Sequence, residues 1–209
     1  MPRLVLMSDT HNKHLEISQV PEGDILVHAG DFSARGSLAE LSNFNEWLGT
    51  LSHRYKILVA GNHDHCFQRT PEQARNLITN AIYLQDSSVE LEGLHFYGSP
   101  WQPWFFDWAF NLTRGAELRA VWEKIPNETD VLITHPPPYG ILDMVLSGKQ
   151  VGCEELAVRV RQLVNLRLHV FGHIHEADGE KQQGNVRFVN ASICTVRYQP
   201  DNSPVVVDL

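Results

Sequence analysis

Residues 4–11 read LVLMSDTH, an apolar run that ends abruptly in polar residues. The apolar part, Leu4–Met7, is short and uninterrupted, which is typical of a β-strand buried on both faces. Asp9 and His11 follow directly, and carboxylate and imidazole side chains both bind divalent cations. The stretch therefore predicts a buried strand that carries a pair of candidate metal ligands at its carboxyl end.

The same arrangement recurs along the chain. Polar clusters end four later apolar runs: AGD (29–31), GNHD (61–64), THP (134–136) and FGHIH (171–175). Open α/β sheets bind their ligands outside the carboxyl ends of the strands, so we expect these clusters to meet at one sheet edge. Mixed carboxylate, amide and imidazole donors gathered there can hold two divalent ions, and they suit Mn, Fe, Co, Ni or Zn.

The rest of the chain alternates between strand and helix patterns. The apolar, β-rich runs are 4–7, 25–28, 57–60, 131–134, 168–171, 186–190 and 205–207. The helix signals are a capping box at Ser37 and Glu40, a start at Thr70-Pro71, and apolar stripes over 118–125 and 156–164. Residues 81–99, with a turn at 86–88 and a glycine at Gly93, predict hairpins. Since neither a repeat nor a linker is present, we predict one α/β domain over residues 1–209.

Composition excludes several classes of protein. The chain has 17 basic and 25 acidic residues, a net charge of −8, which argues against a surface that coats nucleic acid. No apolar run approaches the roughly 20 residues of a membrane span, and no signal peptide is apparent. The three cysteines are widely spaced and odd in number, which is typical of reduced thiols. We therefore expect a cytoplasmic protein with no membrane partner.

Taken together and in order, the clusters resemble the calcineurin-like metallophosphoesterase superfamily, whose signature is Asp-x-His, Gly-Asp, Gly-Asn-His-Asp/Glu, His and Gly-His-x-His. The match spans residues 9–175. Four stretches are similar to the metallophosphoesterase-domain-containing group of the brain-protein-239 type and its bacterial relatives: SPWQPWF (99–105), THPPPYGILD (134–143), FGHIHE (171–176) and VNASICT (189–195). The resemblance implies a four-layer α/β/β/α sandwich.

The resemblance also implies metal ligands in two sets around one shared carboxylate. Asp9, His11 and His175 would hold the first ion, Asn62, His135 and His173 the second, and Asp31 would bridge both. Two ions so placed share a hydroxide whose pKa they lower toward neutrality, and that hydroxide attacks phosphorus in line. Manganese is the first expectation for the metal.

His63 and Asn62 have further roles by the same resemblance. His63 would face the phosphate and the leaving group, where an imidazole can supply the proton that the leaving oxygen needs. Asn62 would also reach a phosphate oxygen. Both are therefore candidate catalytic and substrate-binding residues.

Three other residues are candidates for substrate contact. Arg35 falls where serine/threonine protein phosphatases have a phosphate-binding arginine, although Ala34 replaces the acid that supports their catalytic histidine. Trp101 begins an aromatic run over 101–110, and Tyr139 follows three prolines on a stiff loop. The alternatives are a solvated arginine and aromatic rings that only pack the loop onto the sandwich.

These observations predict a metal-dependent phosphohydrolase of small phosphodiesters, with cyclic nucleotides among the candidate substrates. A diester is preferred over a monoester because, apart from Arg35, the motifs lack a Lys or Arg cluster that would neutralise a dianion. The alternatives are a phosphomonoesterase, a serine/threonine protein phosphatase, or an inactive scaffold of the same fold. The partner is expected to be a small phosphoester or nucleotide, and the sequence leaves the oligomeric state open.

Overall fold

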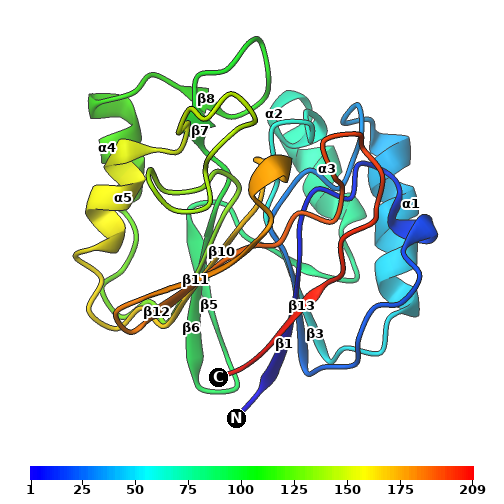
Figure 1. The fold of residues 1–209 in the computed structure, drawn as a ribbon. Helices are drawn as coiled ribbons and strands as arrows, with labels where there is room; N and C mark the ends of the chain where they lie inside the picture. The colour runs from blue at the N-terminus through cyan, green and yellow to red at the C-terminus, as the bar shows by residue number, and fades with distance from the viewer.

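The computed structural model describes residues 1–209 and consists of two β-sheets packed face to face (Figure 1). The first sheet is parallel except for β13 at one edge. Its order is β13 (Val205–Asp208), β1 (Arg3–Met7), β2 (Ile25–His28), β3 (Tyr55–Leu58) and β4 (Ile82–Tyr83). Three of its strands therefore end in the clusters that begin at Asp9, Gly30 and Gly61.

The second sheet has parallel central strands and an antiparallel strand at each edge. Its order is β11 (Gly179–Gln183), β12 (Val186–Asn190), β10 (Leu168–Phe171), β9 (Val131–Thr134), β6 (Leu94–Ser99) and β5 (Ser87–Leu91). A separate short pair, β7 (Gln102–Pro103) and β8 (Asn111–Leu112), stands above the sheets in Figure 1.

Helices cover the outer face of each sheet (Figure 1). The first sheet is covered by α1 (Leu38–Thr50), α2 (Cys66–Arg69) and α3 (Pro71–Leu77), and the second by α4 (Ala116–Trp122) and α5 (Glu154–Val160). Two 3₁₀ turns, η1 (His14–Glu16) and η2 (His175–Ala177), complete the structure. The result is the four-layer α/β/β/α sandwich, so the predicted fold class is confirmed.

The apolar strands explain this layering. Leu4 and Leu6 of β1 point into the core between the two sheets, whereas Val5 and Met7 point outward under the helices. All four are fully buried. Because successive side chains of a strand face opposite sides, an uninterrupted apolar run is what a sheet covered on both faces requires. Burial of each such side chain contributes about 1.5–3 kcal/mol to the free energy of unfolding.

Most predicted elements occur within a residue or two of the expected positions. β2, β9, β10 and β12 have the predicted bounds, and Ser37 and Glu40 form the capping box of α1.

Three predictions of detail are corrected. β3 starts and ends two residues before the predicted strand, because the chain leaves the ladder toward Gly61. α5 ends at Val160, where tighter i→i+3 hydrogen bonds take over. The predicted hairpin turn at Gly93 is present, at Glu92-Gly93 with positive φ at both residues, whereas Ser87 and Ser88 of the predicted 86–88 turn already belong to β5.

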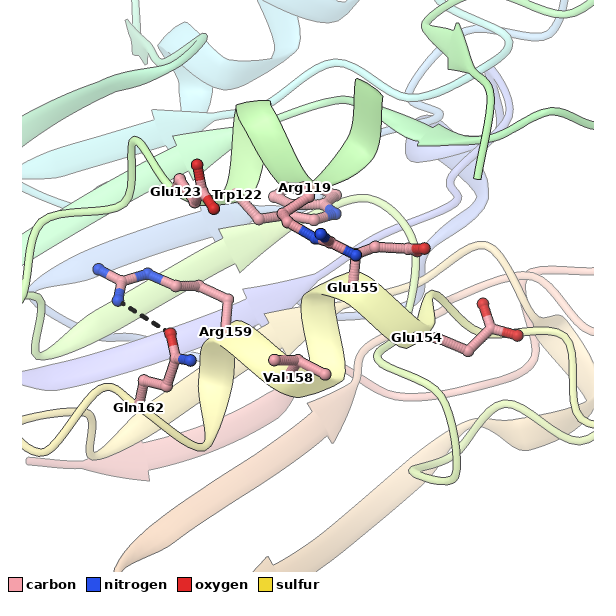
Figure 2. Close-up of a pocket in the computed structure, with 8 residues that line it drawn as sticks. All are labelled: Arg119, Trp122, Glu123, Glu154, Glu155, Val158, Arg159 and Gln162. Carbon is pink, nitrogen blue, oxygen red and sulfur yellow. Dashed lines mark hydrogen bonds between the residues drawn. The ribbon is translucent and has the colours of Figure 1, made fainter. Parts of the chain in front are cut away.

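Helices α4 and α5 lie side by side and enclose a groove of about 330 Å³ on the outer face of the second sheet (Figure 2). Its charged side chains bond largely within this face: Arg159 contacts Gln162 and Asn127. None of the strand-end clusters contributes to it. The longest helix, α1, has 13 residues, and no helix has the length and apolarity needed to cross a membrane.

Candidate metal centre

The five strand-end clusters meet at the end of the sandwich opposite the two chain termini in Figure 1. Backbone hydrogen bonds connect them: Asp9 N–H donates to Gly30 O (2.9 Å), and Gly172 N–H donates to His135 O (3.0 Å). An isolated bridge between Ser8 and Ser192 joins the two sheets at the same place. The clusters therefore converge, but at the adjoining ends of two sheets and not at one sheet edge as predicted: three follow strands of the first sheet and two follow strands of the second.

The backbone at this edge turns sharply in the left-handed region. Asp9 (φ 54°), His11 (φ 43°), Asp31 (φ 55°) and His173 (φ 70°) all have positive φ. Such conformations cost about 1–3 kcal/mol each in a residue with a side chain, and they are concentrated at functional sites. In a continuing strand, successive side chains would alternate between the two faces of the sheet. The positive φ values instead turn the side chains of these four residues toward the site.

Glycines make room for two of the carboxylates. A Cβ atom at Gly172 would overlap the Asp9 carboxylate, and a Cβ at Gly61 would overlap that of Asp31. Both positions therefore require glycine because of close approach. The motifs Gly-His-Ile-His and Gly-Asn-His-Asp thus place their histidines against carboxylates of other strands.

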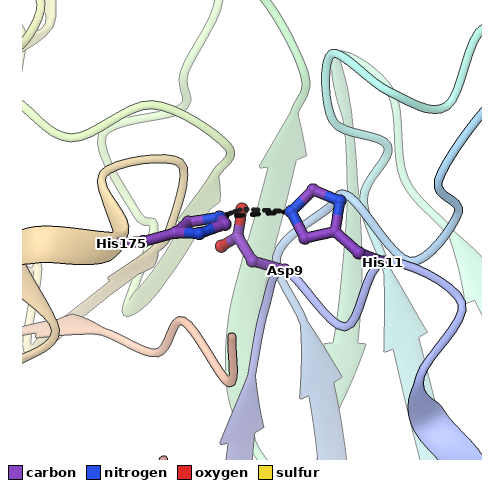
Figure 3. Close-up of side chains that lie close together, drawn as sticks. All are labelled: Asp9, His11 and His175. Carbon is purple, nitrogen blue, oxygen red and sulfur yellow. Dashed lines mark hydrogen bonds and ion pairs between the residues drawn. The ribbon is translucent and has the colours of Figure 1, made fainter. Parts of the chain in front are cut away.

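The first group of candidate ligands combines both sheets (Figure 3). His175 Nε2 lies 3.4 Å from Asp9 Oδ1, and His11 Nε2 lies 3.9 Å from the same oxygen. The two Nε2 atoms, 164 residues apart in the chain, are 3.1 Å from each other. Asp9, His11 and His175 each offer an atom within 4.8 Å of the others, a spacing that one cation can bridge.

Asp31 lies between this group and the rest of the site. Its Oδ2 is 3.4 Å from His135 Nε2 and 3.9 Å from both His11 Nε2 and His63 Nε2. Asp31 belongs to two of the three clusters of possible metal ligands, and Asp9 and His11 also each belong to two. This is the position that a carboxylate shared by two ions needs.

Asn62 and His173 lie beside His135 and complete the second group of candidate ligands. Asn62 Oδ1 lies 2.8 Å from His135 Nε2, and the ring of His173 lies 5.0 Å from that of His135, centroid to centroid. The backbone N–H of His173 donates to Asp9 Oδ2 (3.0 Å), which ties the two sides together. The structure thus brings together every residue predicted as a metal ligand.

Hydrogen bonds on the opposite ring nitrogens orient two of the histidines. His175 Nδ1 donates to Thr195 O (3.1 Å) and His135 Nδ1 donates to Ala29 O (3.0 Å). With Nδ1 donating, Nε2 is the atom that each ring turns toward the site, as in metal-binding histidines. Without an ion, the neighbouring carboxylates outweigh burial and raise the pKa of His135 to about 9 and that of His175 above its ordinary value, so an ion would bind in competition with these protons. Ser192, from a stretch to which no role was assigned from the sequence, supports Asp9 by donating to its Oδ2 (2.9 Å).

The protonation of the site also fits metal binding. Burial lowers the pKa of His11 to about 4 and that of His173 to about 3, so both are neutral imidazoles at pH 7. Burial opposes ionisation of Asp9, but the hydrogen bond from His175 and the nearby histidines outweigh it and hold its pKa well below the usual range. His11 Nδ1 is buried without a partner. Ionised carboxylates, neutral imidazoles and an amide oxygen are a donor set that divalent transition metals accept.

His63 occupies a well-defined position beside this cluster. Its Nδ1 donates to Ala34 O (2.9 Å), and its backbone N–H donates to Asp31 Oδ1 (2.7 Å). Ala34 is the residue that replaces the supporting acid of protein phosphatases, and here its backbone carbonyl accepts the hydrogen bond instead. His63 Nε2 is thereby directed toward the carboxylate of Asp31.

Asp64 connects the loop of Asp31 to the loop of Gly61. Its Oδ2 accepts from the backbone N–H groups of Asp31 (2.9 Å) and Gly61 (2.7 Å), and its Oδ1 accepts from the N–H (3.0 Å) and hydroxyl (2.6 Å) of Ser33. The acid is fully buried, and burial together with the charge of Asp31 raises its pKa to about 8, while the hydrogen bonds from Ser33 and Gly61 favour the ionised form. Its contacts are those of a residue that fixes the turn of the Gly-Asn-His-Asp motif.

The predicted substrate contacts lie in different surroundings. Trp101 donates its indole N–H to Asp86 (2.8 Å) and packs edge-on against Phe110, contacts typical of a packing residue. Arg35 is exposed, and its backbone N–H is bonded to Glu40. Tyr139 is 42% exposed. None of the three makes a hydrogen bond or ring contact with a candidate metal ligand.

Other aromatic residues contact the cluster and were not found from the sequence. The ring of Trp108 lies 4.1 Å from that of His63, and Tyr198 stands edge-on to His11 (4.8 Å) and His175 (5.2 Å). Phe105 lies edge-on to His173 at 6.4 Å. Trp108 and Phe105 belong to the aromatic run over 101–110, but only the fold of the loop selects them over Trp101. Nothing in the sequence around Tyr198 indicates its place.

Known proteins are similar to this chain in sequence and fold. Residues 2–177 match the family described as calcineurin-like phosphoesterase. Metallophosphoesterase domain-containing protein 1 of Homo sapiens is 49% identical over 231 residues, covering 99% of this chain and 71% of the human protein. A protein of Synechococcus named probable cyclic nucleotide phosphodiesterase is 26% identical, covering 74% of this chain and 58% of its own.

Among solved structures, TT1561 of Thermus thermophilus has the same fold, with a TM-score of 0.63 at 15% identity, covering 90% of this chain and 88% of that one. The family match spans the strands and clusters that build the site, from β1 to η2. The chain therefore belongs to the calcineurin-like phosphoesterase family.

Proposed function

We propose that the protein is a phosphodiesterase that hydrolyses small diesters with two divalent ions, manganese first among them. The observation that supports this most directly is the position of Asp31. Its carboxylate faces His11, His63 and His135 from 3.4–3.9 Å, between two groups of neutral or hydrogen-bonded donors. A shared carboxylate with an imidazole beside it is what a two-ion phosphoester hydrolase requires.

The residues divide into two ligand sets. Asp9, His11 and His175 would hold one ion, Asn62, His135 and His173 the other, and Asp31 would contact both. When bound, two such ions lower the pKa of water and neutralise charge on the phosphoryl oxygens.

The chain's own groups then act on the ester. Asn62 can offer its amide to a phosphoryl oxygen while its carbonyl oxygen faces His135. His63, protonated at Nε2, can give a proton to the leaving oxygen, and its bond to Ala34 O keeps the ring in place while it does so. Asp31 accepts the backbone N–H of His63, which fixes the distance between this proton donor and the cluster.

A diester is the better fit to the charges beside these residues. The five clusters contain neither a lysine nor an arginine; Arg35 and Lys13 follow two of them in sequence, and Lys13 pairs with Glu16 (3.5 Å). A dianionic monoester has more charge to neutralise than a monoanionic diester. The name of the Synechococcus relative places cyclic nucleotides among the substrates to test.

We also propose that the protein acts in the cytoplasm on a free small phosphoester or nucleotide. Its three cysteines are free and buried, which suits a reducing compartment. The net charge of −8 is unsuited to coating a nucleic acid.

The decisive experiment compares two nitrophenyl esters on one preparation. Purified protein is stripped with a chelator and reloaded with Mn²⁺, and bound metal is counted by mass spectrometry. We expect two ions per chain, no turnover when stripped, and a higher kcat/KM for bis-p-nitrophenyl phosphate than for p-nitrophenyl phosphate. A preference for the monoester would favour the phosphomonoesterase, and full metal loading without turnover of either ester would favour the inactive scaffold. Full activity without metal would refute the proposal.

A further inference from the structure

Two buried histidines outside the predicted ligand sets lie in strands next to those that carry candidate ligands, one in each sheet. His28 is the last residue of β2, which pairs with β1, and His169 lies in β10, which pairs with β9. Both residues are at most 1% exposed. The proposed chemistry uses neither of them, so their presence in the core needs another explanation.

His28 contacts the loop that carries two ligands of the first set. Its Nε2 lies 3.1 Å from the hydroxyl of Thr10, the residue between Asp9 and His11. Asp9 and His11, on either side of Thr10, both have positive φ (54° and 43°), so this loop leaves the strand in a conformation that needs support. The hydrogen bond to His28 ties the middle of the loop to β2.

His169 makes the equivalent contact in the second sheet. Its Nε2 lies 2.9 Å from the hydroxyl of Thr134, the residue before His135. The same hydroxyl donates to the backbone oxygen of Pro136 (2.8 Å), the residue after His135. His135, a ligand of the second set, is thus held between two residues that this pair of hydrogen bonds connects.

The other ring nitrogen shows the direction of both hydrogen bonds. Burial lowers the pKa of each histidine to about 3, so each is a neutral imidazole with one N–H at pH 7. Nδ1 of each ring is buried without a partner, and a proton there would have no acceptor. The proton therefore lies on Nε2, and each histidine donates to its threonine. For Thr134 the same follows because its own hydroxyl proton is already given to Pro136 O.

An imidazole is an unfavourable way to fill these two places in the core. Its Nδ1 loses its hydrogen bonds to water on burial, and an apolar side chain of similar volume, such as leucine, would avoid that loss. The surroundings suit an apolar side chain, because Phe44 stands edge-on to the ring of His28 (5.1 Å) and Phe171 to that of His169 (5.0 Å). An apolar side chain cannot, however, supply the hydrogen bond to the threonine.

We propose that His28 and His169 are positioning residues, each of which fixes one of the two ligand sets through a threonine hydroxyl. His28 acts on the set that contains Asp9 and His11, and His169 acts on the set that contains His135. The inference rests on the two-ion part of the proposed function. A ligand that is already oriented loses less freedom when an ion binds, so removing either histidine should weaken the ion of its own set and leave the other ion unaffected.

The test measures each ion separately, in a protein that lacks one ligand of the other set. His135→Ala keeps the first set intact, and His175→Ala keeps the second. The affinity of each protein for Mn²⁺ is measured by calorimetric titration. Adding His28→Leu should weaken Mn²⁺ binding roughly 10-fold in the His135→Ala protein, the lower end of what a lost supporting hydrogen bond costs, and leave the His175→Ala protein unchanged. Adding His169→Leu should have the reverse effect.

Glutamine variants separate the hydrogen bond from the packing of the ring. The amide of glutamine can donate from about the position of the imidazole Nε2, so His28→Gln and His169→Gln should restore most of the affinity that the leucine variants lose. His53→Leu is the matched control. His53 is also buried, but it precedes β3 and therefore lies at the end of the first sheet opposite the cluster. Its replacement should change neither affinity.

Two threonine variants give the same readout if a leucine variant does not fold. Thr10→Val and Thr134→Val keep the shape of the side chain and remove the hydroxyl, so each should weaken the ion of its own set. Equal weakening of both ions by one variant, or equal affinities of the glutamine and leucine variants, would overturn the inference. Selective weakening without turnover of any diester would overturn the proposed function alone. Binding of fewer than two ions by the wild type would overturn both.

Discussion

The indole of Trp108 covers the imidazole of His63, with 4.1 Å between ring centroids and 40° between planes. His63 also meets the ring of His11 edge-on at 4.7 Å, and its Nδ1 donates to Ala34 O. The imidazole therefore has one accessible orientation, and only Nε2 remains free to exchange a proton with a ligand. Trp108 is a positioning residue for His63.

Replacing Trp108 with leucine should impair proton donation and leave the metals bound. A leaving oxygen of high basicity needs the proton, and loss of orientation by about 1 Å costs on the order of 100-fold in rate. We expect kcat to fall by about 10- to 100-fold on alkyl diesters, with a much smaller loss on nitrophenyl diesters. Metal content is counted on the same preparation, and equal losses on both classes of ester would contradict the positioning role.

His63→Ala provides the stronger form of the same comparison. Removing the proton donor should lower kcat by about 100- to 10,000-fold on diesters with a basic leaving oxygen. Nitrophenolate leaves without a proton, so the loss on bis-p-nitrophenyl phosphate should be much smaller. Both ions should remain bound. Loss of one ion would instead identify His63 as a ligand.

Asp31→Asn should be more damaging than Asp9→Asn. Asp31 lies 3.4 Å from His135 and 3.9 Å from His11, histidines of both ligand sets, so neutralising it weakens two sites. Asp9 approaches His175 and His11 most closely, at 3.4 and 3.9 Å, and in its other cluster, with His135, the charge of Asp31 would remain. We expect Asp31→Asn to lose more metal and to retain less diesterase activity. The two variants are compared by mass spectrometry of bound metal and by rates at saturating Mn²⁺. Equal metal content and equal rates would show that Asp31 does not bridge.

Asp64→Asn should destabilise the fold rather than act on one chemical step. An amide at this buried position would direct its NH₂ group at donors, either the N–H groups of Asp31 and Gly61 or those of Ser33. We expect the free energy of unfolding in urea to fall by about 2–3 kcal/mol, the cost of buried donors left without an acceptor. Ser33→Ala removes only one donor and should cost roughly 1 kcal/mol. A smaller loss in Asp64→Asn than in Ser33→Ala would contradict this role.

His169 should make the protein less stable in acid. Burial lowers its pKa from 6.5 to about 3, so the unfolded chain binds the proton more readily than the folded one. The free energy of unfolding should therefore fall as the pH drops from 6.5 toward 3, by about 1.4 kcal/mol per pH unit for this group. His169→Gln keeps a donor for Thr134 Oγ1, bonded at 2.9 Å, and does not titrate.

The comparison is made by urea unfolding between pH 7 and pH 4.5 with a chelator present, so that metal release does not contribute. Other buried histidines, such as His28, contribute in the same direction and are common to both proteins. The variant should lose less stability over this range than the wild type. Identical slopes would mean that His169 is protonated in the folded state as readily as in the unfolded chain.

The site residues that could be predicted from the sequence are those that directly follow a β-strand. Uninterrupted apolar runs such as Leu4–Met7 mark strands covered on both faces, and the residue after each run is fixed in space by the sheet itself. Asp9 and His135 could therefore be placed relative to each other although their strands lie in different sheets. Gly61 and Gly172, which make room for the two carboxylates, could also be identified because they belong to the motifs Gly-Asn-His-Asp and Gly-His-Ile-His.

The rest depends on loops, whose paths follow from packing that no local pattern encodes. Trp108 reaches His63 only because Ala109 N–H bonds to Asn62 O (3.1 Å), which seats the aromatic loop on the Gly-Asn-His-Asp turn. Tyr198 reaches His11 because its backbone adopts φ 55°. Trp101, the first aromatic of that run, has instead its own partner in Asp86. The composition identifies residues 101–110 as rich in aromatic side chains, but it does not show which of these side chains contact the site.

The candidate ligands come from both sheets, and this has a consequence for how the molecule unfolds. His11 and His175 are 164 residues apart, so an ion held by both would act as a reversible cross-link across most of the chain. Because the unfolded chain does not hold the ion in this way, an ion bound only by the folded protein stabilises it by mass action, by about 2.7 kcal/mol when free metal is at 100 times its Kd. Metal supply would then affect the stability of the folded protein as well as its activity, and without metal the two sheets would be held together by their apolar faces and by the hydrogen bonds between them, such as those around Ser8 and Ser192.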